Sequence, residues 1–297
     1  MSNNVKVQKI QDFLRSKNIK NINFLNEVYD DIDPFSDNIT KEEIEIVKER
    51  SKNLWYFTLT LARIETVGSD EPINYELNIQ NMTVLYLLEH NLSIYNNVCR
   101  QSYSTTTRVC YYLWRMINDD NYKFRIFSTS MENSRYVVKK IKQMNELLPE
   151  YLRTKTISSR IEILSIINMS THDIKNIFKT NDCDVMIQDL EHITNVLWLL
   201  KGIKASSLNI RVDMFSTVGK TGSPGKYAGD KVVMNSYRWF DELLDVNNIE
   251  DIFKDKLIYV KYDFDQIFDN PIYKHHLLTK LYNGDRSAIN REIDLIR

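Results

Sequence analysis

Short apolar runs alternate with longer amphipathic stretches along most of the chain. The apolar runs are rich in β-branched and aromatic residues, and they predict strands at 91–99, 122–129, 160–167, 184–188, 209–219 and 257–265. Between them the apolar residues recur at helical spacing and predict helices at 106–118, 132–152, 172–180, 195–203, 231–245 and 272–296. Strands that alternate with helices of this length predict an α/β fold, with a mainly parallel central sheet flanked by helices.

The first fifty residues have a different pattern. They are polar and charged, and they contain one helical pattern at 7–17 and the start of another at 40–64, where Thr40 and Glu43 fit a capping box. We find no internal repeat and no low-complexity linker. The expected organisation is therefore an N-terminal helical extension over residues 1–50, followed by one domain over residues 51–297.

Composition narrows the classes of protein. The net charge is −1, so a contact with nucleic acid would have to use a local basic patch. The polar N-terminus does not have the pattern of a signal peptide, and no apolar run approaches the roughly 20 residues that span a bilayer, so we expect no membrane partner. The three cysteines are too scattered for a disulfide framework or a zinc site, and are expected to be buried and reduced, as in a cytosolic protein.

Ligands of parallel sheets bind at the carboxyl ends of the strands, which selects three loops, 99–106, 188–194 and 216–229. The first loop, in VCRQSYSTTTRVCYYLW (98–114), lies where a phosphate loop would be, but it has neither the glycines nor the lysine that such a loop uses. Arg100 could supply a cation and Thr105 or Thr106 a hydroxyl. The alternative is an ordinary turn in which Ser104 or Thr105 caps the helix.

The third loop contains four of the seven glycines, in TVGKTGSPGKYAGDK (217–231). Its lysines, Lys220, Lys226 and Lys231, could contact DNA phosphates or couple a nucleotide to movement. An exposed, solvated loop is the alternative, and the sequence does not decide between the two.

The order of these segments resembles the ATPase domain of the large terminase of tailed bacteriophages, the motor that packages DNA into capsids. In that family a phosphate loop opens with arginine and glutamine, as RQSYSTTT does, and a later helix ends in a leucine-proline stretch like LLPEYL. KNLWYFTLTLARIETVG and ELNIQNMTVLYLLEHN resemble segments that precede the family's first strand. DVMIQDLEHITN falls at the Walker B strand, and MFSTVG resembles the coupling motif. The likeness runs from about residue 50 to the C-terminus.

The resemblance implies a role for individual residues. Arg100, Gln101, Ser102, Ser104, Thr105 and Thr106 would form the nucleotide-binding loop, and Ser216 and Thr217 the coupling pair. Thr105 and Asp189 would hold Mg²⁺. The implied catalytic residues are Asp189, Glu191 and Arg100.

Three departures from the family indicate a degenerate nucleotide site. Ser104 stands at the position of the Walker A lysine, Gln188 at that of the Walker B aspartate and Asp189 at that of the catalytic glutamate. A shift of one residue would instead make Asp189 the magnesium ligand and bring Glu191 near the γ-phosphate. A serine cannot neutralise the transferred phosphoryl group, so we expect impaired or lost hydrolysis unless Arg100 or Arg108 supplies the missing charge.

The resemblance implies a P-loop NTPase-like fold and two competing functions. The first is an ATPase of the DNA-packaging motor that binds ATP and Mg²⁺, weakly if at all, and works in a homo-oligomeric ring in the host cytoplasm at the procapsid portal. The second is a non-catalytic pseudo-ATPase that binds double-stranded DNA, the portal protein, the small terminase subunit or a full-length terminase. No carboxylate cluster of a nuclease follows the domain, so nuclease activity is not expected. The sequence leaves open whether the chain is complete. A third interpretation, an unrelated α/β protein, would be favoured if the strand after residue 209 did not lie beside the strand that ends at Val98.

Overall fold

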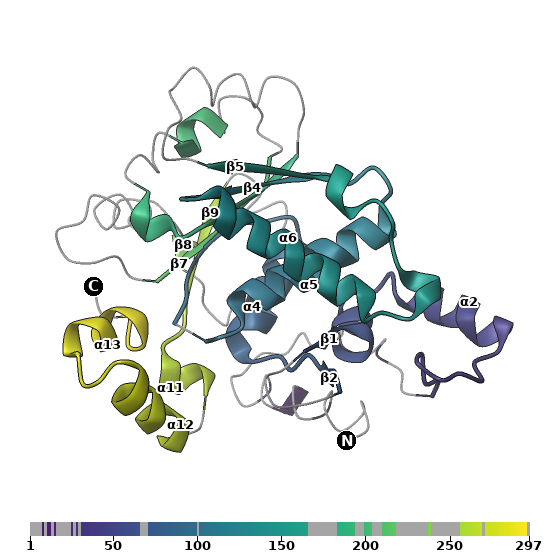
Figure 1. Ribbon diagram of the computed structural model, residues 1–297, viewed down its shortest axis with the longest axis horizontal. Coiled ribbons are helices and arrows are strands. Elements are labelled where there is room, and N and C mark those ends of the chain that lie inside the picture. Colours follow the sequence, from purple (N-terminus) through teal and green to yellow (C-terminus); the bar gives the residue numbers. More distant parts are fainter. Residues whose placement is uncertain are drawn as a thin grey trace.

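A seven-stranded sheet forms the centre of the molecule in the computed structural model (Figure 1). The structure describes residues 31–65, 71–99, 101–165, 183–193, 199–203, 210–217, 237–238, 256–268 and 271–295, together with residues 8, 11, 12, 15, 25 and 28. The strand order is β5-β4-β6-β7-β3-β9-β8, and every described pairing in this sheet is parallel. The strands are β3 (Ser93–Asn97), β4 (Phe124–Ser128), β5 (Ile161–Ser165), β6 (Asp184–Gln188), β7 (Val212–Ser216), β8 (Tyr237–Arg238) and β9 (Leu257–Lys261). The predicted fold class is confirmed.

Strand β7 lies directly beside β3, as the terminase resemblance requires. Asn97 pairs with Ser216, and the backbone N–H of Val98 donates to the carbonyl of Ser216 at 2.8 Å. On the other side of β7, Gln188 pairs with Phe215. Because the three strands are parallel and in register, their carboxyl ends meet at one edge of the sheet, and the loops that follow them start side by side.

Three helices cover one face of the sheet, α4 (Ile79–Glu89), α5 (Ser104–Asn118) and α6 (Met131–Glu146) (Figure 1). Their apolar side chains join a large core in which Leu85, Leu113 and Ile141 are fully buried. A second core on the opposite face combines strand residues with Leu190, Ile193, Leu199 and Ile203. Burial on both faces explains the nearly continuous apolar strand sequences.

The helix predicted over 40–64 is broken into pieces. Helix α2 (Lys41–Arg50) begins with the predicted capping box and is followed by α3 (Leu54–Tyr56), a π-helix (Phe57–Leu61) and strand β1 (Arg63–Ile64), which pairs antiparallel with β2 (Ile73–Asn74). The break occurs because the Asn53 side chain accepts hydrogen bonds from the N–H groups of Trp55 and Tyr56 and starts a new helix. Val47 of α2 is fully buried in the same core as α4 and α5.

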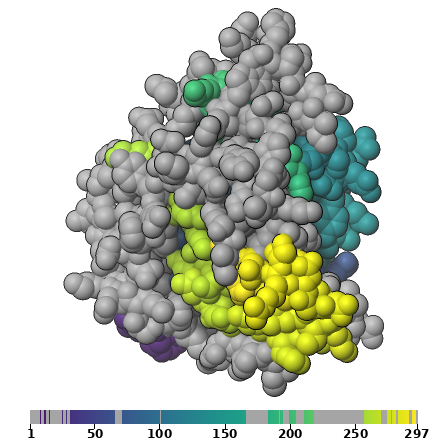
Figure 2. All heavy atoms as spheres, turned by 90° about the vertical axis from the view of Figure 1, so that its left-hand side faces the viewer, coloured from purple at the N-terminus to yellow at the C-terminus, as the bar shows by residue number. Residues whose placement is uncertain are grey.

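The C-terminal helices, from Phe264 onward, pack against the start of the first loop. This part contains α11 (Phe264–Ile267), α12 (Pro271–His276), a π-helix (Leu277–Leu281) and α13 (Arg286–Glu292), and a turn at Asn283 and Gly284 interrupts the helix expected over 272–296. Figure 2 shows these helices as one continuous patch of the surface. Ile293 and Leu295 pack with Cys99, the residue before Arg100. The C-terminal helices therefore contact the start of the first loop and hold it in place.

One predicted helix is wrong where the structure describes it. Tyr237 and Arg238, expected in a helix over 231–245, form strand β8 and pair with β9. The edge of β9 offers unpaired backbone N–H and C=O groups, and these residues form hydrogen bonds with them. This pairing is more favourable here than the helix that the surrounding sequence pattern predicts. The expected helix over 172–180 and the glycine-rich residues 218–229 lie outside the described residues. Among the described helices, none is both long and apolar enough to cross a bilayer.

Two short helices connect α6 to β5. The 3-10 helices Glu150–Leu152 and Ile157–Ser159 follow α6 and lead into β5. The predicted helix over 132–152 therefore ends at Glu146, and Leu152 is buried in the main core.

Candidate nucleotide site

A cavity of about 690 Å³ lies at the carboxyl edge of the sheet. It is lined by the loop after β3, by Asp189 after β6, by the end of β7 and by Tyr136 of α6. The cavity brings together eight residues that the sequence nominated, Gln101, Ser102, Ser104, Thr105, Thr106, Asp189, Ser216 and Thr217. Residues of all three predicted ligand loops therefore line one cavity: loop 99–106, Asp189 of loop 188–194, and the first two residues of loop 216–229.

The loop after β3 contains two left-handed residues and no glycine. Gln101 and Tyr103 have φ angles of 63° and 60°, in the left-handed region that glycine normally occupies. A non-glycine residue there costs about 1 kcal/mol or more. Loops of this kind turn successive N–H groups toward one side and form concavities that bind anions.

A buried cluster of polar side chains holds this loop from behind. The Gln80 amide of α4 donates to the hydroxyls of Ser102 and Ser104, at 3.1 Å each, and the two hydroxyls are 2.8 Å apart. Asn78 donates to the Ser102 carbonyl at 3.2 Å. Ser104 is only 7% exposed, and its hydroxyl is hydrogen-bonded to Gln80 and lies beside that of Ser102. Serine at this position therefore fixes the loop to α4 and offers the cavity no charge.

Helix α5 begins at the cavity with an open N-terminus. Its N-cap is Tyr103, which makes no side-chain capping bond, so the prediction that Ser104 or Thr105 caps the helix is wrong. The reason is that the Ser104 hydroxyl is held by Gln80, and the chain enters the helix through a left-handed residue. The first N–H groups of a helix have no partner inside it and, with the helix dipole, favour an anion. Thr105 and Thr106 are half-buried beside them.

Asp189 faces the loop from the end of β6. It has a φ of 57°, and its carboxylate accepts a hydrogen bond from the Asn133 amide at 3.0 Å and a longer one from Ser128 at 3.5 Å. Gln188, at the position expected for the Walker B aspartate, is the last residue of β6, and it is buried. Glu191 falls in a 3-10 helix at Leu190–His192, and its side chain lies outside the described residues.

The expected coupling pair ends β7. Ser216 is buried, and its hydroxyl donates to the Thr217 carbonyl at 2.9 Å and lies 3.4 Å from the Tyr95 hydroxyl. Because Ser216 also pairs with Asn97 at the start of the loop, the cavity wall and the loop share one sheet register.

Arg108 cannot supply the missing cation. Its side chain is fully buried, and the guanidinium donates to one Asp213 oxygen at 2.8 and 3.0 Å and to the Ser104 carbonyl at 3.1 Å. Its carbon also lies 4.1 Å from the centre of the Phe215 ring. The expectation for Arg108 is therefore corrected. Arg100 lies outside the described residues.

The described lining of the cavity contains one carboxylate, Asp189, and no lysine or arginine. Burial raises the pKa of Cys99 to about 12, so this lining thiol stays protonated at neutral pH. Within the described parts of the chain, no three His, Cys, Asp or Glu residues gather around a metal position. The Asp189 carboxylate and the Thr105 hydroxyl are oxygen donors that suit Mg²⁺, which often takes one or two protein ligands together with phosphates.

Sequence reasoning missed the residues that hold the site in place. Gln80 and Asn133 come from α4 and α6 and fix the loop and Asp189, respectively. Tyr75 donates to or accepts from Thr107 at 2.6 Å, and its ring meets Tyr103 edge-on at 6.5 Å. A signal for Asn133 existed, because it follows the predicted strand 122–129 and therefore lies near the carboxyl edge of the sheet, where ligands bind.

The left-handed backbone at Gln101 gives a testable change in stability. Gln101→Gly is expected to raise the free energy of unfolding by about 0.5–1 kcal/mol, because glycine adopts this conformation without strain. Urea unfolding measures the difference. The matched control is Gln143→Gly inside α6, which should lower it by about 1 kcal/mol. A loss of stability at both positions would contradict the strained loop.

Comparison with known proteins places the fold. No protein-family model matches the chain, and no curated protein does. Among solved structures, the large terminase ATPase domain of Thermus phage P74-26 matches with a TM-score of 0.51 at 9% identity, over 74% of this chain and 94% of that domain. The HK97 bacteriophage large terminase matches with a TM-score of 0.48 at 12% identity, over 79% of this chain but 48% of its own length.

At identities of 9–12%, structural similarity shows the fold alone. Of these two structures, we base the comparison on the P74-26 domain, which has the higher TM-score. The match extends over nearly the whole of that domain, 94% of its length, and over 74% of this chain. The chain therefore has the fold of the ATPase domain of a phage large terminase.

Proposed function

We propose that this chain is a terminase-type motor domain that binds ATP in the cavity at the carboxyl edge of the sheet and hydrolyses it slowly or not at all. The observation that carries the proposal is the loop backbone, which keeps the left-handed residues Gln101 and Tyr103 although the sequence provides no glycine there. Backbone strain of this kind is typical of ligand-binding and active sites and is uncommon in a turn that only connects two elements. The open N-terminus of α5 and Asp189 face the same cavity.

The cavity has room beside it for the rest of a nucleotide. A second cavity of about 870 Å³ shares Gln101, Tyr103, Thr106 and Tyr136 with the first. Its floor contains the apolar residues Val109, Met144 and Leu147. With the phosphates at the start of α5, the base and sugar fit this adjoining space, where the partly exposed rings of Tyr103 and Tyr136 offer stacking surfaces.

The chemistry expected of this site is binding without efficient turnover. When bound, Mg²⁺ would offset part of the triphosphate charge, with Asp189 and Thr105 as the residues that hold it. Asn133 orients the Asp189 carboxylate, and the N–H groups at the start of α5 face the phosphates. A charged donor at the transferred phosphoryl group contributes several kcal/mol, and within the described lining no residue takes that role. Arg100, or a residue of a neighbouring subunit in a ring, is the source that we propose.

The partners proposed for this function are double-stranded DNA, the portal protein and the small terminase subunit or a full-length terminase, at the portal in the host cytoplasm. The division into an extension over residues 1–50 and a motor domain over 51–297 belongs to the same proposal. A second candidate is a pseudo-ATPase that serves as a binding protein. The hydrogen bonds that hold Ser104 to Gln80 favour it, because the lysine position has acquired a structural role.

Titration calorimetry with ATP and Mg²⁺, paired with a phosphate-release assay, tests the proposal. We expect binding, with turnover about 10²–10³ times lower than that of the P74-26 ATPase domain measured alongside, the range lost when one charge-stabilising donor is removed. Arg100→Ala should abolish any residual turnover. Turnover equal to that of the P74-26 domain would contradict the proposal, whereas absence of both binding and turnover would favour the pseudo-ATPase.

A further inference from the structure

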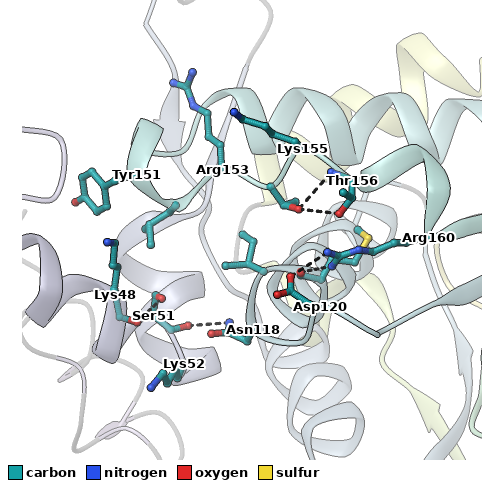
Figure 3. A pocket seen from close by; sticks show the side chains of 14 residues that line it. Lys48, Ser51, Lys52, Asn118, Asp120, Tyr151, Arg153, Lys155, Thr156 and Arg160 are labelled. Atoms are coloured by element: carbon teal, nitrogen blue, oxygen red, sulfur yellow. Dashed lines mark hydrogen bonds and ion pairs between the residues drawn. The ribbon is translucent and has the colours of Figure 1, made fainter.

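A third cavity, at the opposite edge of the sheet, has a basic lining. It measures about 490 Å³ and lies between helix α2, the end of α5 and the segment that leads from α6 to β5 (Figure 3). Its lining includes five basic residues, Lys48, Lys52, Arg153, Lys155 and Arg160. Since the whole chain has a net charge of −1, this is a local concentration of positive charge.

The acidic residues near this cleft leave most of that charge available. Asp120 is the one carboxylate in the lining, and it pairs with Arg160 at 3.1 Å. Arg160 also donates to the carbonyls of Met116 and Asp119, so it caps the negative end of α5. The remaining four basic residues form the group to which a ligand would bind, which we call the basic cleft: Lys48, Lys52, Arg153 and Lys155.

Within the basic cleft, Lys48 of α2 and Lys52, which follows α2, have partners that are easily exchanged. Lys48 pairs with Glu45 and Lys52 with Glu49, each three residues away and with a well-exposed carboxylate. Exposed pairs of this kind contribute about 0–1 kcal/mol, so a ligand phosphate can replace them. Arg153 is exposed and donates its Nε to the Leu148 carbonyl, and among the described residues none accepts from its outer nitrogens, which can therefore bind a ligand. Lys155 is exposed as well.

The lining favours a phosphate backbone over a protein segment. Binding of a peptide relies on aromatic or aliphatic anchors in apolar pockets. The apolar residues of this cleft are already committed, because Met116 and Leu152 are buried in the core and the Tyr151 hydroxyl donates to the Pro34 carbonyl. Arginine and lysine side chains around a polar hollow are the groups that contact DNA phosphates.

We propose that the basic cleft binds the phosphate backbone of double-stranded DNA, independently of base sequence. The inference rests on the proposed function only in choosing DNA as the polyanion. It assigns the contact to the amino edge of the sheet, opposite the nucleotide cavity at the carboxyl edge. Nucleotide and DNA would then bind at opposite edges of the same sheet.

The test is fluorescence anisotropy of the full chain with a labelled DNA duplex of random sequence, at several salt concentrations. The double variant Arg153→Glu with Lys155→Glu should weaken binding at least tenfold and reduce the salt slope by about 1–2, because each lost phosphate contact lowers it by about 0.9. Lys155→Glu alone, which disturbs no described hydrogen bond, should give about half of that loss on a logarithmic scale.

The matched control is Lys139→Glu with Lys142→Glu, which makes the same change in net charge on the exposed side of α6. It should leave DNA affinity within about twofold of the unmodified chain, apart from the long-range effect of charge. Equal losses in both double variants, or no DNA binding by the unmodified chain at low salt, would overturn the inference. Titration of the same variants with ATP separates the two proposals, since the basic cleft variants should bind ATP normally whether or not they bind DNA.

Discussion

Asp213→Ala is expected to lower the free energy of unfolding by about 3–5 kcal/mol, a large fraction of the stability of a typical domain. Asp213 and Arg108 form an ion pair in which both side chains are fully buried. The alanine variant leaves the guanidinium without its anion in a place that water does not reach, and only the Ser104 carbonyl still accepts from it. Urea unfolding, extrapolated linearly to zero denaturant, measures the loss.

A matched control separates burial from pairing. Asp120→Ala makes the same substitution in a pair with Arg160, but the Asp120 side chain is 95% exposed, so the expected loss is below about 1 kcal/mol. The double variant Arg108→Met with Asp213→Leu should recover most of the stability, because an apolar pair needs no counter-charge. If Asp213→Ala costs no more than Asp120→Ala, the Arg108–Asp213 pair is not shielded from water.

The buried pair also shows what the sequence could have predicted. Arg108 lies in the apolar stretch RVCYYLW, and Asp213 lies in the apolar strand RVDMFS. A charged residue in each of two buried elements needs a partner, so the pairing could have been proposed once β7 was placed beside the first loop and its helix. Sequence spacing instead favours a ligand role for Arg108, because it lies close to Thr105 along the chain. The direction in which a helix faces the sheet is not readable from spacing alone.

The strands were predictable because burial on both faces requires continuous apolar runs, and β6 begins and ends where the sequence indicates. The loop after β3 was only half predictable. Its place at the sheet edge follows from topology, but its left-handed residues are glutamine and tyrosine, which give no sign of such a backbone. Their conformation depends on Gln80 and Asn78, more than twenty positions earlier.

Asp189→Asn is expected to change nucleotide affinity in opposite directions with and without Mg²⁺. With Mg²⁺ present, the variant should bind ATP about ten times more weakly or worse, because an amide oxygen is a neutral and poorer ligand than a carboxylate. In EDTA it should bind ATP somewhat more tightly, because the one carboxylate in the described lining no longer repels the triphosphate. Calorimetry in the two buffers measures both effects.

Asparagine is the substitution that isolates charge. It keeps the size of Asp189 and is among the few residues that tolerate its φ of 57°, so the turn after β6 should be preserved. The matched variant is Asn133→Ala, which keeps the carboxylate but removes the donor that orients it at 3.0 Å. That variant should lose a few-fold affinity with Mg²⁺ and change little in EDTA. A loss of the same size in both buffers would show that Asp189 supports the fold of the cavity rather than a metal, and the magnesium assignment would then have to be given up.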